Sequence, residues 1–140
     1  MSGYSGTPIA KKLGIGPGCR VLVTGAPAAY RTIVDLPDGV TLARTPGARV
    51  DVFHAFVTQR SELASRLPRW LAAMRADAVV WVSWPKRASK LPTDVTEDVV
   101  REVALPLGLV DVKVCAVDER WSGLKLVIRK ERRAAHAEGR

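Results

Sequence analysis

The sequence predicts an α/β protein: a three-layer, Rossmann-like sandwich with a mostly parallel sheet of about six strands that ends in an antiparallel β-hairpin. Three observations support this fold class. Apolar, β-branched segments alternate with helix-like segments along most of the chain, as in a parallel sheet with helical connections. Ala78–Trp84 is apolar, β-branched and aromatic except for Ser83, which is typical of a strand buried on both faces. The link between the last two strands is too short for a crossover, so that pair must be antiparallel.

The first half of the chain is expected to contribute three strands and two helices. Thr7 can cap a helix in which Pro8 takes the first position, and Gly14 ends it. Pro37–Gly39 breaks the second helix, and Thr45–Gly47 is too short a link to hold a third. The expected elements are a helix at 7–14, a strand at 20–25, a helix at 28–36, an edge strand at 40–44 and a strand at 50–57.

The second half begins with an interrupted helix. Apolar residues recur at helical spacing from Leu63 to Met74, but Pro68 lies among them. We therefore expect either a kinked helix or two short helices at roughly 60–66 and 68–75. Asp94 and Glu97 have the spacing of a capping box, so a helix should begin at Asp94 and end near Gly108. The expected strands are 78–84, which is central in the sheet, 109–117 and 124–129.

Composition indicates one domain, at residues 1–130, followed by a basic, flexible tail at 131–140. The chain has 140 residues, 47% of them apolar, enough for a single core. No apolar run approaches the roughly 18 residues that span a bilayer, so no membrane association is expected. The N-terminus lacks a signal peptide and the two cysteines sit in apolar surroundings as reduced thiols, so the expected location is cytoplasmic.

The net charge of +8 leaves a polyanionic partner open. Part of this charge lies in the C-terminal tail, and the rest is spread along the chain. The aromatic and basic signatures of nucleic-acid-binding modules are missing. We therefore expect nucleic acid to be an unlikely partner, while the oligomeric state stays open.

Three phrases resemble a family of small actinobacterial proteins called domain of unknown function 3052. They are YSGTPIAKKLGI at Tyr4–Ile15, WVSWPKRAS at Trp81–Ser89 and GLVDVKVCAVDERWSGLK at Gly108–Lys125. The family has no assigned role, so the resemblance implies no activity.

The final helix, strand and hairpin also look like the C-terminal half of class I methyltransferases. Those enzymes bind S-adenosylmethionine through a glycine-rich loop after the first strand and an acidic residue after the second. The corresponding positions here hold one glycine and a proline in Thr24–Tyr30, and no acid in Leu42–Thr45. We therefore expect no cofactor, neither S-adenosylmethionine nor a nicotinamide dinucleotide.

The candidate site lies where the strands end, because ligands of open α/β sheets collect at the carboxyl ends of the strands. A tryptophan beside cations could stack a planar ring and hold a phosphate or carboxylate, although a tryptophan that covers the core explains the same pattern. Asp118 or Glu119 could act as a base, although turn residues in surface ion pairs explain them more simply. The candidate ligand-binding rim comprises Thr24, Gly25, Thr58, Trp84, Lys86, Arg87, Ser89, Lys90, Asp118, Glu119, Trp121 and Ser122.

No catalytic or metal-binding set is predicted. His54 lies among apolar residues and is expected to be a hydrogen-bonded interior histidine, and the scattered histidines and cysteines lack metal-ligand spacing. We expect a non-catalytic module, ligand-binding or regulatory, that takes a small anionic or planar ligand. Two alternatives stay open: a degenerate transferase-like enzyme, and a scaffold whose basic surface binds nucleic acid or an acidic protein.

Overall fold

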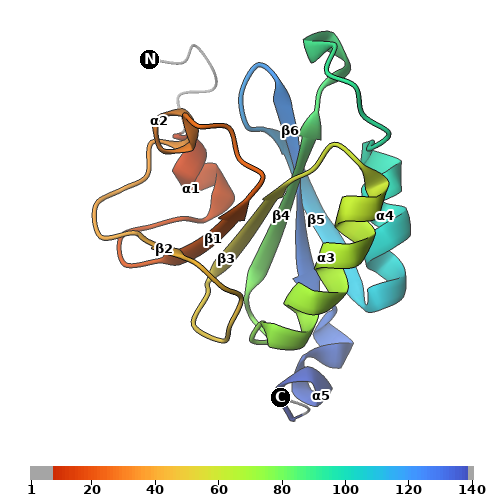
Figure 1. Ribbon diagram of the computed structural model, residues 1–140. Coiled ribbons are helices and arrows are strands. Elements are labelled where there is room, and N and C mark those ends of the chain that lie inside the picture. Colours follow the sequence, from red (N-terminus) through yellow and green to blue (C-terminus); the bar gives the residue numbers. More distant parts are fainter. Residues whose placement is uncertain (1–7, 139–140) are drawn as a thin grey trace.

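Six strands form the middle layer of the molecule in the computed structural model, which describes residues 8–138 (Figure 1). Their bounds are β1 Arg20–Thr24, β2 Thr41–Ala43, β3 Val52–Phe56, β4 Val79–Pro85, β5 Leu109–Ala116 and β6 Trp121–Ile128. The order across the sheet is β2-β1-β3-β4-β6-β5. The predicted fold class, a mostly parallel sheet that ends in an antiparallel hairpin, is thereby confirmed.

The central position of β4 follows from its composition. β2, β1, β3 and β4 run parallel, whereas β6 is antiparallel to both β4 and β5. Of the seven residues of β4, only Val79 is not fully buried. Pro85 closes the strand opposite Trp121, at the position where its missing N–H costs least.

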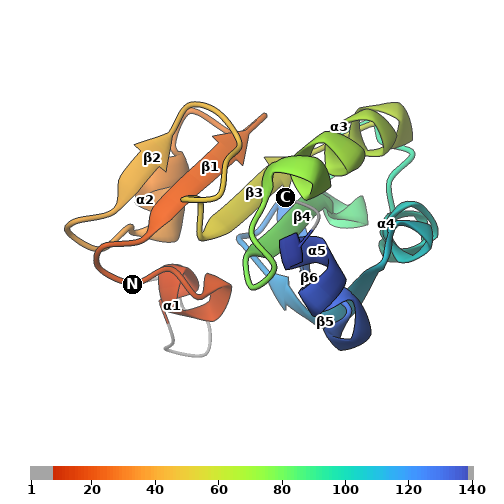
Figure 2. The same ribbon diagram turned by 90° about the horizontal axis from the view of Figure 1, so that it is seen from below.

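Helices cover both faces of the sheet (Figure 2). One face packs against α1 (Ile9–Leu13) and α2 (Tyr30–Val34), and the other packs against α3 (Arg60–Ala73) and α4 (Glu97–Ala104). Trp81 lies in the core on the α1 side, where its Nε1 donates a hydrogen bond of 2.9 Å to the carbonyl of Leu13. This bond joins the first helix to the central strand.

The helix across Pro68 is continuous, so of the two predicted alternatives the pair of short helices is wrong and a single helix is present. α3 runs for 14 residues with Pro68 inside it. Leu63, Leu67 and Trp70 are buried on one side of this helix. Their burial holds the segment helical and offsets the hydrogen bond that proline removes.

The predicted capping box of α4 is also wrong. Thr96 is the N-cap of α4, and its Oγ1 accepts a hydrogen bond of 3.2 Å from the backbone N–H of Val99. Asp94 instead accepts from the backbone N–H of Arg60 at 2.6 Å, at the beginning of α3. The predicted helix cap at Thr7 lies outside the described residues, while Gly14, in the left-handed region, ends α1 as predicted.

The segment after β6 forms helix in the structure. Residues Lys130–Arg132 make a 3-10 turn, η3, and Arg133–Glu138 make α5. His136 Nε2 donates a hydrogen bond of 2.6 Å to the carbonyl of Met74, and Arg133 Nε donates one of 3.0 Å to the carbonyl of Ile128. The segment expected to be a tail therefore contacts the end of α3 and the end of β6. Within residues 8–138, no helix combines the length and the apolar character needed to cross a membrane.

Candidate functional site at the carboxyl edge of the sheet

The carboxyl ends of β1, β3 and β4 meet at one edge, shown at the top of Figure 1. The turn between β5 and β6 lies at the same edge because these strands are antiparallel. The backbone N–H of Lys86 donates a hydrogen bond of 2.7 Å to the carbonyl of Arg120, which joins the loop after β4 to that turn. The predicted site segments therefore share one edge of the molecule.

Gly25 has a role in bringing two of these strand ends together. Its φ is 68°, and a Cβ added there would collide with the carbonyl oxygen of Phe56 at the end of β3. Only glycine combines this conformation with so close an approach of backbone to backbone. The single glycine of this loop thus faces a neighbouring strand.

The two tryptophans of the predicted rim belong to the core. Trp84 is 7% exposed and packs on the α3 side, and Trp121 is 9% exposed and packs on the other side. Trp121 meets Phe56 edge to face, with ring centroids 5.0 Å apart. The prediction that Trp84 stacks a planar ligand needs an open ring face, which this burial removes. The simpler reading of Trp84, a tryptophan that covers the core, describes the structure.

The basic loop after β4 is an ordered turn. Residues Arg87–Ser89 form the 3-10 turn η1, and Ser89 Oγ donates a hydrogen bond of 2.7 Å to the carbonyl of Lys86. Arg87 and Lys90 are exposed, and Lys86 is half-buried. None of these three cations forms an ion pair with a residue of the described chain. The positive charges of Lys86, Arg87 and Lys90 are therefore not neutralised by a carboxylate of the described chain.

Three carboxylates at the same edge accept hydrogen bonds from backbone N–H groups. One oxygen of Asp118 accepts hydrogen bonds of 2.8 Å from the N–H groups of Arg120 and Trp121. Glu62 accepts from the N–H groups of Thr58 and Gln59 at 3.3 and 3.2 Å. Asp94 likewise accepts a hydrogen bond from the backbone N–H of Arg60.

The remaining rim residues complete this picture. The carbonyl of Thr58 accepts a hydrogen bond of 2.7 Å from Thr93 Oγ1, which fastens the approach to α4 onto the end of β3. Ser122 is half-buried opposite Trp84 in the β4–β6 pair, and Glu119 is exposed in the turn. Of the two residues considered as a base, Asp118 thus shapes the turn through its backbone hydrogen bonds, and Glu119 is exposed to solvent.

His54 is enclosed in a polar chain inside the sheet. Its Nδ1 is hydrogen-bonded to Tyr30 OH at 3.0 Å, and its Nε2 to Ser83 Oγ at 2.7 Å. All three residues are buried, and burial lowers the pKa of His54 to about 3 and raises the pKa of Tyr30. The imidazole is neutral and satisfied on both nitrogens, as the sequence predicts for an interior histidine. Its hydrogen-bond partners come from α2 and β4, so the sequence around His54 could not predict which residues they are.

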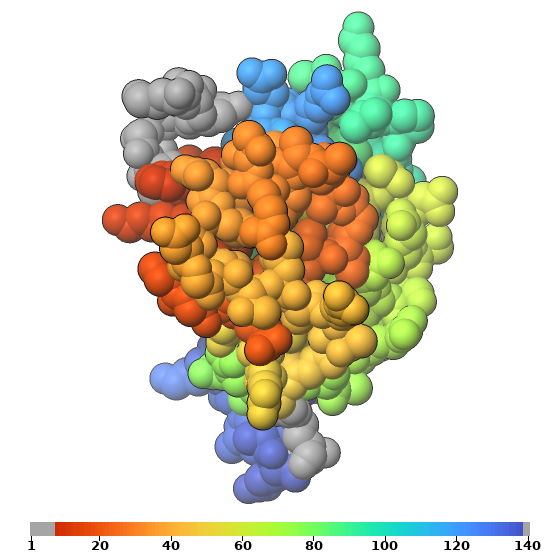
Figure 3. All heavy atoms as spheres, turned by 60° about the vertical axis from the view of Figure 1, so that its left-hand side comes forward, coloured from red at the N-terminus to blue at the C-terminus, as the bar shows by residue number. Residues whose placement is uncertain are grey.

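A cavity lined by arginines is the feature that sequence reasoning missed. It measures about 170 Å³ and lies between the end of β1, the end of β2 and α3. Figure 3 shows this side of the molecule, with the orange and yellow segments around β2 in front and α3 in yellow-green beside them. The residues that line it are Leu22, Thr24, Arg44, Pro46, Arg66, Arg69 and Trp70.

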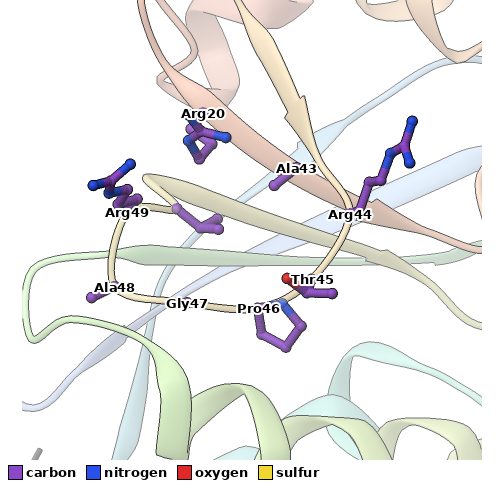
Figure 4. A pocket seen from close by; sticks show the side chains of 9 residues that line it. Arg20, Ala43, Arg44, Thr45, Pro46, Gly47, Ala48 and Arg49 are labelled. Carbon is purple, nitrogen blue, oxygen red and sulfur yellow. The ribbon is translucent and has the colours of Figure 1, made fainter.

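A second hollow, of about 240 Å³, lies under the loop from Ala43 to Val50. Figure 4 shows Arg44 at one end of this loop, and Arg20 and Arg49 together at the other end. The two hollows share Arg44 and Pro46. Arg66 and Arg69 are visible in the sequence as an i, i+3 pair, but the contribution of Thr24 appears only in the fold.

No protein-family model matches this chain, and no curated protein matches it. The resemblance to the domain of unknown function 3052 therefore stays a prediction.

Solved structures show similarity of fold. The m1A22 tRNA methyltransferase TrmK of B. subtilis has a TM-score of 0.56 at 10% identity, over 90% of this chain and 68% of that chain. A protein in the NADB-Rossmann superfamily from Streptococcus agalactiae has 0.53 at 14%, over 91% and 70%. Fibrillarin of Aeropyrum pernix, in complex with natively bound S-adenosyl-L-methionine, has 0.50 at 17%, over 85% and 73%. The chain shares the Rossmann-like fold of these methyltransferase-type structures, and identities this low show the fold alone.

Proposed function

We propose that this chain is a non-catalytic, ligand-binding or regulatory module that takes a small anionic ligand at the carboxyl edge of its sheet. One observation carries the proposal: Lys86, Arg87 and Lys90 have no ion-pair partner in the described chain, while Asp94 and Asp118 at the same edge accept hydrogen bonds from backbone N–H groups. An anion that arrives here meets free donors on Lys86, Arg87 and Lys90. Charge-assisted hydrogen bonds of this kind are about twice as strong as neutral ones.

The same geometry argues against catalysis. A general base must lie within hydrogen-bond reach of the substrate proton. His54 is enclosed, and an oxygen of Asp118 is held by two backbone donors. Binding without chemistry is what the remaining exposed groups support.

A transferase-like enzyme is the second candidate, and the fold of TrmK and fibrillarin favours it. The residues here do not fit S-adenosylmethionine. Gly25 faces the carbonyl of Phe56, where a cofactor-binding loop would present bare backbone to its ligand. The end of β2 carries Arg44, which cannot accept a hydrogen bond from a ribose hydroxyl as an acidic residue would. We therefore derive no step through this cofactor.

A ligand screen distinguishes the two candidates. Nucleotides, aromatic carboxylates and S-adenosylmethionine would be titrated into the protein, with amide chemical shifts as the readout. An anionic ligand should shift amides of residues 86–90, and Lys86→Ala should weaken it about fivefold or more. Lys113→Ala, which removes the same charge from exposed strand β5, should leave the affinity unchanged.

Two results would contradict the proposal. Equal loss of affinity in Lys86→Ala and Lys113→Ala would show a diffuse charge effect with no site at this edge. A dissociation constant of about 10 μM or better for S-adenosylmethionine, roughly −7 kcal/mol, would instead support the transferase.

A further inference from the structure

Two buried polar atoms that belong to residues lining the arginine cavity lack a hydrogen-bond partner. They are Thr24 Oγ1 and Arg66 Nη1, and no other buried side-chain nitrogen or oxygen of the described chain stands unpartnered in this way. Both residues line the same cavity, one from the end of β1 and the other from α3. Buried polar groups in folded proteins are nearly always hydrogen-bonded, and those that are not need an explanation such as a bound group.

The charge of the residues that line the cavity indicates that the bound group is an anion. Three arginines line it, Arg44, Arg66 and Arg69, and no acidic residue does. None of the three takes part in an ion pair with another residue among 8–138. Guanidinium groups present planar donor forks that match the oxygens of a phosphate, and a threonine hydroxyl adds a donor beside them.

We infer that this cavity binds a phosphate group, free or as the end of a phosphomonoester. Arg66 and Thr24 would turn their unpartnered Nη1 and Oγ1 toward its oxygens, and the exposed Arg44 and Arg69 would balance its charge. A group of this kind satisfies both unpartnered donors at once, whereas an apolar ligand would leave them unsatisfied.

The size of the cavity agrees with a single phosphate group. Its volume of about 170 Å³ is well above the ~10–15 Å³ that a single water needs. Pockets for drug-sized ligands begin near ~300 Å³. A phosphate therefore fits inside, and the rest of an ester would lie outside the cavity.

This inference goes beyond the proposed function because it needs none of the cations of residues 86–90. The two sites have only Thr24 in common. A failure at one site therefore leaves the other standing, and separate variants tell them apart.

The experiment is a titration of the protein with inorganic phosphate and with phenyl phosphate, at constant ionic strength held by chloride. Calorimetry gives the affinity, and the melting temperature gives an independent readout. Arg66→Met should weaken phosphate at least tenfold and abolish the rise in melting temperature. Arg49→Met is the matched control, since it removes an arginine from the neighbouring hollow only, and it should bind as the native chain does.

Thr24→Val keeps the experiment decisive if Arg66→Met folds poorly. Valine has nearly the shape of threonine, so the variant should melt at or above the native temperature without phosphate and gain less from phosphate. Lys86→Ala should bind inorganic phosphate normally. If Arg49→Met and Arg66→Met weaken phosphate binding equally, the inference is wrong. It is also wrong if phosphate raises the melting temperature no more than chloride does, because the cavity then holds water only.

Discussion

His54 shows how one side chain takes its state from its surroundings. The imidazole lies between Tyr30 and Ser83 with no exposed surface. Because burial penalises the charged form, its pKa falls to about 3. At neutral pH the ring is an uncharged link that donates through one nitrogen and accepts through the other.

This state makes folding stability depend on pH. The pKa in the folded protein, about 3, lies below the ordinary value of ~6.5 in the unfolded chain. Between these values the unfolded chain binds a proton that the folded protein does not, so stability falls as the pH drops below 6.5. We expect a loss of about 2 kcal/mol between pH 7 and pH 5, measured by urea denaturation.

His54→Gln is the control for this pH dependence. The amide can keep hydrogen bonds but does not titrate, so the variant should be less stable at pH 7 and should lose less between pH 7 and pH 5. An unchanged slope in His54→Gln would mean that another group causes the acid sensitivity.

At the scale of elements, the start of α3 is capped by one local carboxylate and one that is distant in sequence. Its first backbone N–H groups are served by Glu62, from its own first turn, and by Asp94, which follows the basic loop. A carboxylate at this end also meets the favourable end of the helix dipole. Asp94 therefore ties the approach to α4 onto the start of α3.

The variant Asp94→Ala tests which helix this residue caps. The loss of one cap should cost about 1 kcal/mol, within the range of ~0.5–2 for such residues. Amide hydrogen exchange should accelerate at the start of α3, near Arg60, and not at the start of α4. Thr96→Ala is the matched control and should accelerate exchange in α4; faster exchange in α4 for Asp94→Ala would instead support a local capping box.

Most elements could be predicted from local pattern, and the errors share one cause. The apolar run of β4 and the short link before β6 are local signals, and both led to correct elements. The partner of Asp94 and the burial of Trp84 depend on which segments the fold brings together. The arginine cavity depends on the same information, because Thr24 comes from β1 and Arg66 from α3. The spacing of residues along the sequence does not show which distant segments come into contact.

The charge of the whole molecule is divided among separate places. Cations stand in the loop at residues 86–90, around the loop between β2 and β3, and along the C-terminal segment, which lies at the opposite end of the molecule from residues 86–90 (Figure 1). The exposed rings that would stack bases are missing from the rim, since Trp84 and Trp121 are buried. A continuous nucleic-acid groove is therefore not the arrangement that the described residues form.

We accordingly expect only weak, non-specific retention of single-stranded oligonucleotides at low salt. Counterion release makes such binding fall by a slope of ~0.7 per phosphate contact on a log–log plot against salt, so it should vanish near physiological ionic strength. Removal of the residues after Lys130 should reduce it further. Fluorescence anisotropy across a salt series measures this, and tight binding that persists at ~150 mM salt in the shortened chain would make nucleic acid the first candidate partner.

The place of β6 between β4 and β5 constrains how the protein can be assembled during translation. β4 pairs with β3 on one side, but its other neighbour is the last strand to be made. At ~5–20 residues per second, a growing chain carries β4, in which six of seven residues are buried in the folded protein, with an open edge for roughly 2–9 s between the synthesis of Pro85 and that of Ile128. During that interval the strand can pair with other nascent chains, so a pause before residue 121 would favour aggregation over folding.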